Sequence, residues 1–280
     1  MTPKYRIAGS CLVLLTLVAL PAYAGVKQAG AELLARVQQA YDRSASMKSE
    51  AGEYTLRLWH KQPGKTETDS HGEASVAISG DKFNISVKWL TGKKTIAHEY
   101  AYDGKRLVCE GHSVAKSSAR EADSIRRWFT ARRYLDPRRI YYFYKPNETR
   151  IVGKELVNGV ECLMLEGVHR HIEKDGGRRI ETLRIWVAPS MDYTVHRFRH
   201  WIEGGMMKPL GAKSLYRELN VQFGKYNNGQ WRPAVVTRDE YRVDAKTGNR
   251  YRDSRLVKTY SPDYKLNTPV ETPIVSAILE

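Results

Sequence analysis

The sequence has few of the residues that build reactive or metal-binding sites. It contains three cysteines among 280 residues, with no Cys-x-x-Cys pair, no Gly-x-Ser-x-Gly elbow, no His-Glu-x-x-His motif and no phosphate-cradling glycine loop. Its acidic residues are scattered over polar positions and form no pair with catalytic spacing. We therefore predict no enzyme activity, no catalytic residues, no cofactor and no metal. A hydrolase of unknown type is the alternative, because active sites need not be local in sequence.

The histidines offer little metal-binding geometry. His196 and His200 are four residues apart, which in a strand is about 13 Å and too far for one ion. His169 and His171 share a strand face at about half that distance, which leaves a weak metal site open there.

Long apolar runs are absent except near the start of the chain. The run Cys11–Leu20 follows two basic residues and precedes Ala22–Ala24, a small-x-small cleavage pattern. It is too short to span a bilayer, which needs about 20 residues. We predict a cleaved signal peptide over residues 1–24 and a single domain over residues 25–280. Export of this type places the mature protein in the periplasm of a Gram-negative-type cell envelope.

Acidic residues are too few to balance the basic ones. The chain has 46 Lys and Arg against 31 Asp and Glu, a net charge of +15, and the signal segment removes two bases to leave +13 (15 minus 2). Such a charge favours lipid headgroups, lipopolysaccharide, an anionic membrane surface or an acidic protein, and export argues against nucleic acid. A solvated basic surface is the alternative. The candidate contacts to an anionic partner are the arginines Arg126, Arg127, Arg132 and Arg133.

Only Cys109 and Cys162 remain after the signal segment is removed. In an oxidising compartment they can form a disulfide, yet each lies in an apolar strand, where a free cysteine behaves as a small hydrophobe. The sequence leaves both alternatives open.

Strand patterns dominate the rest of the chain. Residues 82–89 alternate strictly between polar and apolar, as in an antiparallel sheet with one solvated face. Residues 151–202 form a predicted meander whose first turn is Asn158-Gly159. Apolar residues at helical spacing predict a helix over residues 26–47, and further helices fit between residues 117 and 144. These patterns predict a mainly β (α+β) fold, a strongly curved antiparallel sheet or half-open barrel of about eleven strands, closed by amphipathic helices.

A curved sheet plugged by amphipathic helices encloses apolar space that suits acyl chains. Each buried methylene contributes about 0.8 kcal/mol, so a cavity holds a lipid without chemistry. The candidate lipid-binding residues are Phe83, Ile85, Val87, Trp89, Tyr100, Tyr102, Leu163, Leu165, Leu183, Ile185 and Trp201, and the candidate lid residues are Leu33, Val37 and Trp128. Packing of these side chains in an ordinary core is the alternative.

Several short motifs resemble one known superfamily. They are Val152-Gly153-Lys154-Glu155, Asn158–Cys162, Arg184–Tyr193, Ala101–Arg106 and Phe223–Pro233. Together they resemble the LolA/LolB-like superfamily, whose members are periplasmic carriers of lipoproteins and other lipids. The resemblance covers most of the mature chain and implies a LolA-like fold. One departure is Asp81-Lys82, where the carriers have an Arg-Pro pair, so the resemblance transfers no lid-closing arginine.

The resemblance and the patterns together predict a periplasmic carrier that holds a lipid, or the acyl chains of a lipoprotein, without catalysis. The alternative within the superfamily is a sensor or regulator resembling RseB, which binds an inner- or outer-membrane protein partner. We expect a monomer that binds no nucleic acid.

Overall fold

The structure is a computed structural model that describes residues 28–44, 49–110, 119–131, 148–172, 176–204, 213–225, 229–244 and 246–266. The predicted signal peptide lies outside these residues. A helix covers residues 28–44, here called the N-terminal helix. The other elements are β1 (Ser49–His60), β2 (Thr68–Ser79), β3 (Lys82–Thr91), β4 (Lys94–Tyr102), β5 (Leu107–Glu110), α2 (Ala119–Phe129), β6 (Thr149–Val157), β7 (Val160–Ile172), β8 (Arg178–Ala188), η2 (Pro189–Met191), β9 (Thr194–Gly204), β10 (Ser214–Lys225), β11 (Trp231–Val243), β12 (Arg250–Tyr260) and β13 (Lys265–Leu266).

All described strands belong to one antiparallel sheet in the order β5-β4-β3-β2-β1-β12-β11-β10-β9-β8-β7-β6, with β13 beside β1. The strands therefore form two meanders, β1–β5 and β6–β12, joined where β1 pairs with β12. Among the described residues β5 and β6 are the edges, and the sheet stays open. The predicted curved antiparallel fold is confirmed, with thirteen strands rather than about eleven. The two-residue β13 is too short to show an alternation, so sequence patterns miss it.

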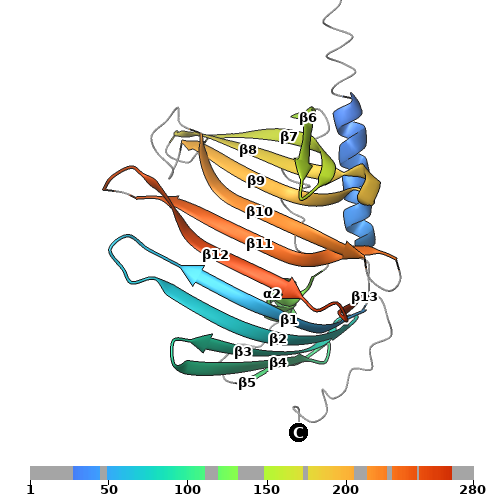
Figure 1. Cartoon of the computed structure of the whole chain (residues 1–280), viewed down its shortest axis with the longest axis vertical. Coiled ribbons are helices and arrows are strands. Elements are labelled where there is room, and N and C mark those ends of the chain that lie inside the picture. The colour runs from blue at the N-terminus through green and yellow to red at the C-terminus, as the bar shows by residue number, and fades with distance from the viewer. Residues whose placement is uncertain are drawn as a thin grey trace, which may run out of the picture.

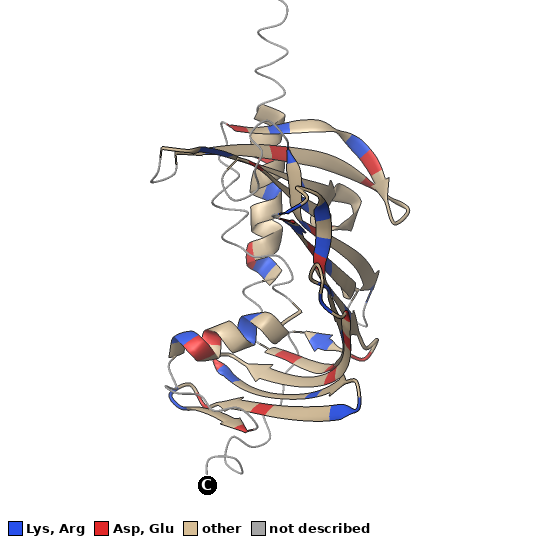
Figure 2. Ribbon diagram, turned by 90° about the vertical axis from the view of Figure 1, so that its left-hand side faces the viewer, with Lys and Arg blue, Asp and Glu red and all other residues tan. Residues whose placement is uncertain are grey.

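The sheet bends around a single large core (Figure 2). Its inner side, here called the concave face, carries buried apolar side chains such as Phe83, Ile85 and Leu183, each 0% exposed. The alternating partners of these residues point to the opposite, convex face. Both helices lie on the concave side, as Figure 2 shows.

The N-terminal helix buries Leu33, Leu34, Val37 and Tyr41 in this core. Those residues follow the predicted apolar stripe, so the helix covers the sheet with one face. It also approaches β6 closely at Gly30, where a Cβ atom would lie 2.7 Å from the carbonyl oxygen of Thr149. Only glycine permits that approach, which sets the position of the helix on the sheet.

The hairpin of β6 and β7 folds onto the convex face (Figure 1). Its turn is Asn158-Gly159, with positive φ at both residues, as a two-residue hairpin of this type needs. The Asn158 amide donates to the carbonyl of Val221 in β10 at 3.4 Å. Glu155 of β6 accepts hydrogen bonds at 2.7 Å from Trp186 and from Arg197. These contacts cover a second, smaller core on the convex face, made of Val157, Cys162, Trp186, Ala188 and Met191.

The two cysteines in the described residues, Cys109 and Cys162, are both free. Cys109 pairs with Tyr100 and packs against the concave core, whereas Cys162 is part of the convex cluster. Their strands also lie near opposite ends of the strand order. A disulfide between them is therefore not part of this fold.

Thiol labelling should separate the two cysteines. We expect two iodoacetamide adducts on the mature chain in urea, but labelling of Cys109 before Cys162 in the folded protein. Burial raises the pKa of the Cys162 thiol to about 11, and the thiolate is the nucleophile. Cys109 is only partly buried. Intact mass spectrometry measures both states, and an unreduced chain that takes no label in urea would contradict the free-thiol structure.

Candidate functional site

The apolar part of the concave face gathers most of the predicted lipid contacts. Phe83, Ile85, Val87, Tyr102, Leu165, Leu183 and Ile185 are members of the large core, and Trp89, Tyr100 and Leu163 pack against it. Register places the β3 and β4 residues opposite one another, Phe83 with Tyr102 and Ile85 with Tyr100. The expectation that these ten residues share one apolar face is met. Their contact with a lipid stays a prediction.

Trp201 does not lie on this face, so its assignment to the predicted lining is wrong. Directly paired residues share a face, and Trp201 pairs with Thr182 while His200 pairs with Leu183. The reason is an extra residue, His196, where the register shifts beside Trp186. A one-residue shift moves every later side chain to the other face. Trp201 therefore lies on the convex face, 5.5 Å from the Arg184 guanidinium and 4.9 Å from the Lys213 ammonium.

A half-open cavity of about 230 Å³ lies between α2 and the β3–β4 end of the sheet. Phe83 and Tyr102 line it from the sheet, and Ala119 and Ala122 line it from the helix. At about 30 Å³ per water-sized group it has room for about eight such groups. It is also smaller than ordinary small-molecule pockets, which start near ~300 Å³. A long acyl chain would therefore not fit in this cavity alone.

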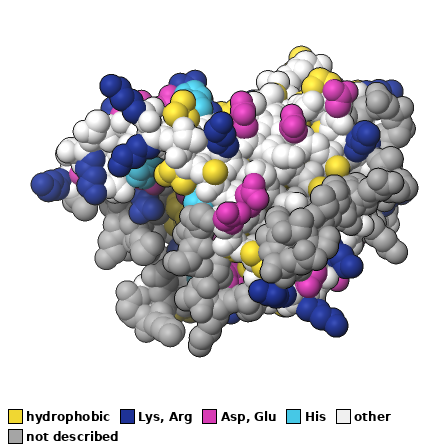
Figure 3. Space-filling model, turned by 90° about the horizontal axis from the view of Figure 1, so that it is seen from below, with side chains coloured by type: hydrophobic (Ala, Val, Ile, Leu, Met, Phe, Trp, Pro, Cys, Tyr) yellow, Lys and Arg dark blue, Asp and Glu magenta, His cyan; other side chains and the backbone are white. Residues whose placement is uncertain are grey.

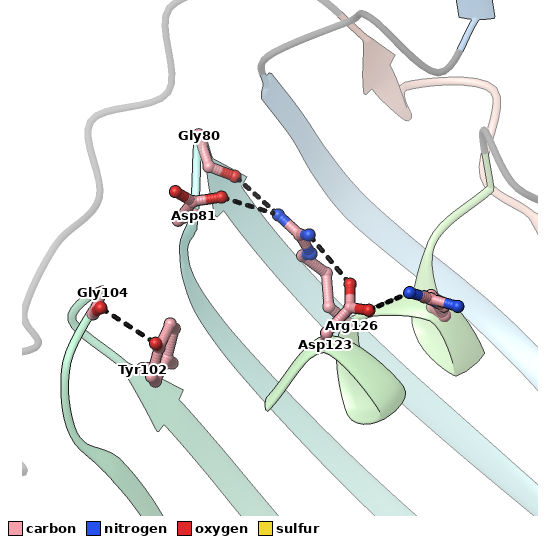
Figure 4. Close-up of polar contacts among 7 residues, drawn as sticks. Gly80, Asp81, Tyr102, Gly104, Asp123 and Arg126 are labelled. Atoms are coloured by element: carbon pink, nitrogen blue, oxygen red, sulfur yellow. Dashed lines mark hydrogen bonds and ion pairs between the residues drawn. The ribbon is translucent and has the colours of Figure 1, made fainter. Parts of the chain in front are cut away.

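One arginine of α2 connects the helix to the sheet beside this cavity (Figure 4). Arg126 donates to the Gly80 carbonyl at 3.1 Å and lies 3.3 Å from the Asp81 carboxylate, both in the turn between β2 and β3. It also bonds Asp123 at 3.0 Å, within the helix. Arg127 pairs with Asp123 as well, within α2. Arg126 therefore links α2 to the turn between β2 and β3 through Gly80 and Asp81.

The C-terminal end of α2 is held more firmly, by a buried carboxylate. Glu50 of β1 is 0% exposed and accepts hydrogen bonds from the Thr130 hydroxyl, the Ala131 backbone N–H and the Tyr264 hydroxyl. The Tyr54 hydroxyl donates to the carbonyl of Phe129 at 3.1 Å. These contacts join β1, the segment before β13 and the end of the helix.

Lys258 adds a cation at the same end of α2. Its ammonium donates to the Trp128 carbonyl and lies 4.5 Å from the Trp128 ring and 5.6 Å from the Tyr54 ring. Burial and the charge of Arg238 lower the pKa of Lys258 to about 7, against the opposing effect of Glu50. A cation near the last carbonyls of a helix is favourable, so Lys258 complements the Glu50 contacts.

The predicted lid and anion-contact residues have different positions. Leu33 and Val37 are buried in the core, and Trp128 is 36% exposed. A lid role for them stays a prediction. The Arg126 side chain is 19% exposed and engaged by three acceptors, so it is a structural contact of α2 rather than an open anion-binding group. Arg127 is 39% exposed, and Arg132 and Arg133 lie outside the described residues.

Basic side chains are visible on the outside of the molecule as well. Figure 3 views it from the β5 side and shows Lys and Arg gathered mainly at one end, with acidic side chains across the middle. On the convex face many arginines are paired, for example Arg184 with Glu166 at 2.5 Å and Arg199 with Glu218 at 2.8 Å. Contact with an anionic membrane surface stays a prediction.

A group of polar side chains occupies the concave face beside the apolar core, and one of them, Arg238, is near enough to Lys258 to lower its pKa. Its position follows from register, since His169 pairs with Glu181, His200 with Arg217 and Arg217 with Glu240. We call it the polar band, and its members are His169, His171, Arg179, Glu181, His200, Arg217, Arg238 and Glu240.

Glu181 is the centre of one half of the polar band. Its carboxylate accepts from His200 at 2.9 Å, lies 3.5 Å from the His171 ring nitrogen and pairs with Arg179. Burial raises the pKa of Glu181, but the His200 hydrogen bond and the charges of His200 and Arg179 outweigh it and lower the pKa to about 2. His169 and His171 ring nitrogens are 2.7 Å apart. This half of the band therefore carries an ionised carboxylate surrounded by cationic or protonatable groups.

Glu240 is the centre of the other half. Arg217 lies 2.7 Å from its carboxylate and Arg238 lies 3.7 Å from it. Among the described residues, no group of three or more His, Cys, Asp or Glu side chains has the arrangement to hold a metal ion. The weak metal site left open at His169 and His171 therefore finds no third ligand there.

Sequence patterns drew attention to His169, His171 and His200 only as metal-binding candidates, and they missed the rest of the polar band as well as Glu50 and Lys258. A signal was present in β11, where Val236, Arg238 and Glu240 occupy alternate positions, so that charges continue an apolar face. In β9 the same is true of Phe198 and His200. Charged residues at inward-facing positions are uncommon unless they are paired. The presence of such residues in these strands could therefore have indicated a paired polar cluster on the inner face.

No helix within the described ranges has the length and apolar character that spanning a membrane requires. No family model and no curated protein matches this chain. Solved structures do. A DUF1329 family protein from Desulfovibrio piger is 14% identical, with a TM-score of 0.38, over 91% of this chain and 97% of its own.

Two further structures are similar. A LolA superfamily protein from Nitrosomonas europaea is 11% identical, with a TM-score of 0.34, over 84% of this chain and 92% of its own. LprF from Mycobacterium bovis is 14% identical, with a TM-score of 0.30, over 87% of this chain and 96% of its own.

Proposed function

We propose that this protein is a periplasmic carrier that holds a lipid, or the acyl chains of a lipoprotein, on the concave face between sheet and helices, without catalysis. The observation that carries the proposal is the apolar part of the concave face, which lies beneath two separate helices. The mature protein would be a single domain over residues 25–280, delivered by the signal peptide over residues 1–24.

The helices offer a route for cargo. The residues that follow α2, Thr130 and Ala131, are anchored through Glu50, and the cavity runs along the helix from Ala119 to Arg126. We propose that the helix opens at its Ala119 end, which is the end farther from this anchor. Opening would join the cavity to the apolar surface of Phe83 and its neighbours, and each methylene buried there would add about 0.8 kcal/mol of affinity.

Native mass spectrometry of the mature protein, purified from its own periplasm without detergent, tests the proposal. We expect a stoichiometric bound lipid or acylated peptide, released intact by organic extraction. Release of cleaved fatty acid would favour the hydrolase alternative. A chain that stays apo after incubation with lipids would contradict the carrier and leave a regulator that binds a membrane protein.

A matched pair of variants checks that the cargo enters beneath α2. Ala119→Trp fills the cavity, because Ala119 lines it, and should reduce lipid occupancy severalfold. Arg120→Trp places the same side chain at the next, exposed position, which is not among the lining residues, and should leave occupancy unchanged. Equal occupancy in both variants would place the entrance elsewhere.

A further inference from the structure

Arginines share carboxylates on both faces of the sheet, and on the convex face Asp239 pairs with Arg255 and lies 3.9 Å from Arg252. Arg255 on the convex face donates two hydrogen bonds of 2.7 Å to Asp239. On the concave face, Arg217 and Arg238 share the single carboxylate of Glu240, which leaves one positive charge in excess. Arg238 Nε lies 3.7 Å from that carboxylate, beyond hydrogen-bond distance.

Two further observations show unused capacity for an anion. Within the described part of the chain, the buried Nε of Arg217 has no acceptor. Burial lowers the pKa of Arg238; Glu240 raises it, and the nearby charge of Arg217 lowers it further. The two guanidinium groups therefore repel one another inside a partly desolvated site, and an added anion would relieve that repulsion.

The site is also placed at a boundary between polar and apolar surface. Arg238 pairs with Leu219 on one side and with Leu256 on the other, and both leucines belong to the large core. Arg217 lies opposite His200 in the neighbouring strand, and His200 is hydrogen-bonded to Glu181, so the two halves of the band are adjacent. A molecule bound here would have its charged group at the arginines and its apolar part along the concave face.

From this placement we infer that Arg217 and Arg238 form a headgroup subsite for a lipid whose phosphate-bearing headgroup has a net negative charge. Guanidinium groups bind phosphate in forked geometry, and a neutral or zwitterionic headgroup would not supply the missing charge. The inference rests on the proposed carrier function and names the class of its cargo.

The test compares lysophosphatidylglycerol with lysophosphatidylcholine of the same acyl chain, below their micelle concentrations, by calorimetry on the mature protein. We expect the anionic lipid to bind about tenfold more tightly, as a charged hydrogen bond would provide. In Arg238→Gln the preference should disappear, because binding of the anionic lipid weakens while binding of the zwitterionic lipid stays the same. Glu240 keeps its closer partner Arg217 in this variant, so the fold is retained.

The control is Arg57→Gln, which removes the same charge from the opposite face of β1, where Arg57 pairs with Asp69 and is 58% exposed. It should keep the preference. Equal affinity for both lipids in the unmodified protein would overturn the headgroup subsite and leave the carrier standing, whereas binding of neither lipid would overturn the carrier itself. Competition by inorganic phosphate as strong as that of the anionic lipid would identify a site for free anions and overturn the headgroup assignment.

Discussion

Replacing Glu50 by alanine is expected to lower the free energy of unfolding by about 3–5 kcal/mol, a large part of the stability of an ordinary domain. The carboxylate is 0% exposed and accepts from Thr130, Ala131 and Tyr264. Hydrogen bonds to a buried charge are worth about 1.5–3 kcal/mol each, and their donors would be left buried after the substitution. Lys258 would also lose the nearby negative charge that favours its protonated form.

Urea denaturation measures the loss of stability, and hydrogen exchange locates it. The amides in the last turn of α2 should lose protection first, because Glu50 joins that turn to β1. Glu53→Ala is the matched control, since Glu53 lies on the same strand, is exposed and faces the other side of the sheet. It should change stability by less than about 0.5 kcal/mol. Similar losses in the two variants would show that α2 is not held through Glu50.

Replacing Arg126 by alanine is expected to speed the release of a bound acyl chain about tenfold, with little change in global stability. The bond from Arg126 to the Gly80 carbonyl connects α2 to the sheet beside the cavity, and the side chain is 19% exposed. Loss of about 1.4 kcal/mol from the closed state corresponds to a factor of about ten. The exposed carboxylate of Asp81 contributes less, because it is 85% exposed and its ion pair is screened by water.

Transfer of a fluorescent lipid from the protein to vesicles, followed by stopped flow, measures the rate. Arg127→Ala serves as control, because it removes the pair with Asp123 within α2 and leaves the contact to the β2–β3 turn. It should release lipid at the unmodified rate. If both variants release lipid equally fast, the contact with Gly80 does not hold the helix closed.

The local features of this fold follow from the sequence alone. Alternation in residues 82–89 predicts a strand with one buried face, and the structure has that strand as β3. The pair Asn158-Gly159 predicts a hairpin, because both residues accept positive φ, and both have it. Helical spacing predicts the N-terminal helix and the burial of Leu33 and Val37. In each case the physical cause acts over a few neighbouring residues, so a short stretch contains it.

The tertiary structure decided which distant segments meet. Pairing of β1 with β12 joins the two meanders. Neither strand has a local sequence feature that identifies the other as its partner. The register shift at His196 turned Trp201 to the convex face, although plain alternation along β9 points it inward. Glu50 and Tyr264 meet across 214 residues of sequence.

The candidate sites depend on the same long-range contacts. In the sequence, Arg217 and Arg238 are indistinguishable from ordinary exposed charges in a strand. The strand register of the structure places both beside Glu240, on the face that also carries Leu219. Sequence by itself determined the strands, the turns and the apolar face that suggests a lipid. Only the tertiary structure decided where charge enters that face, because strand order and bulges set which side chains share it.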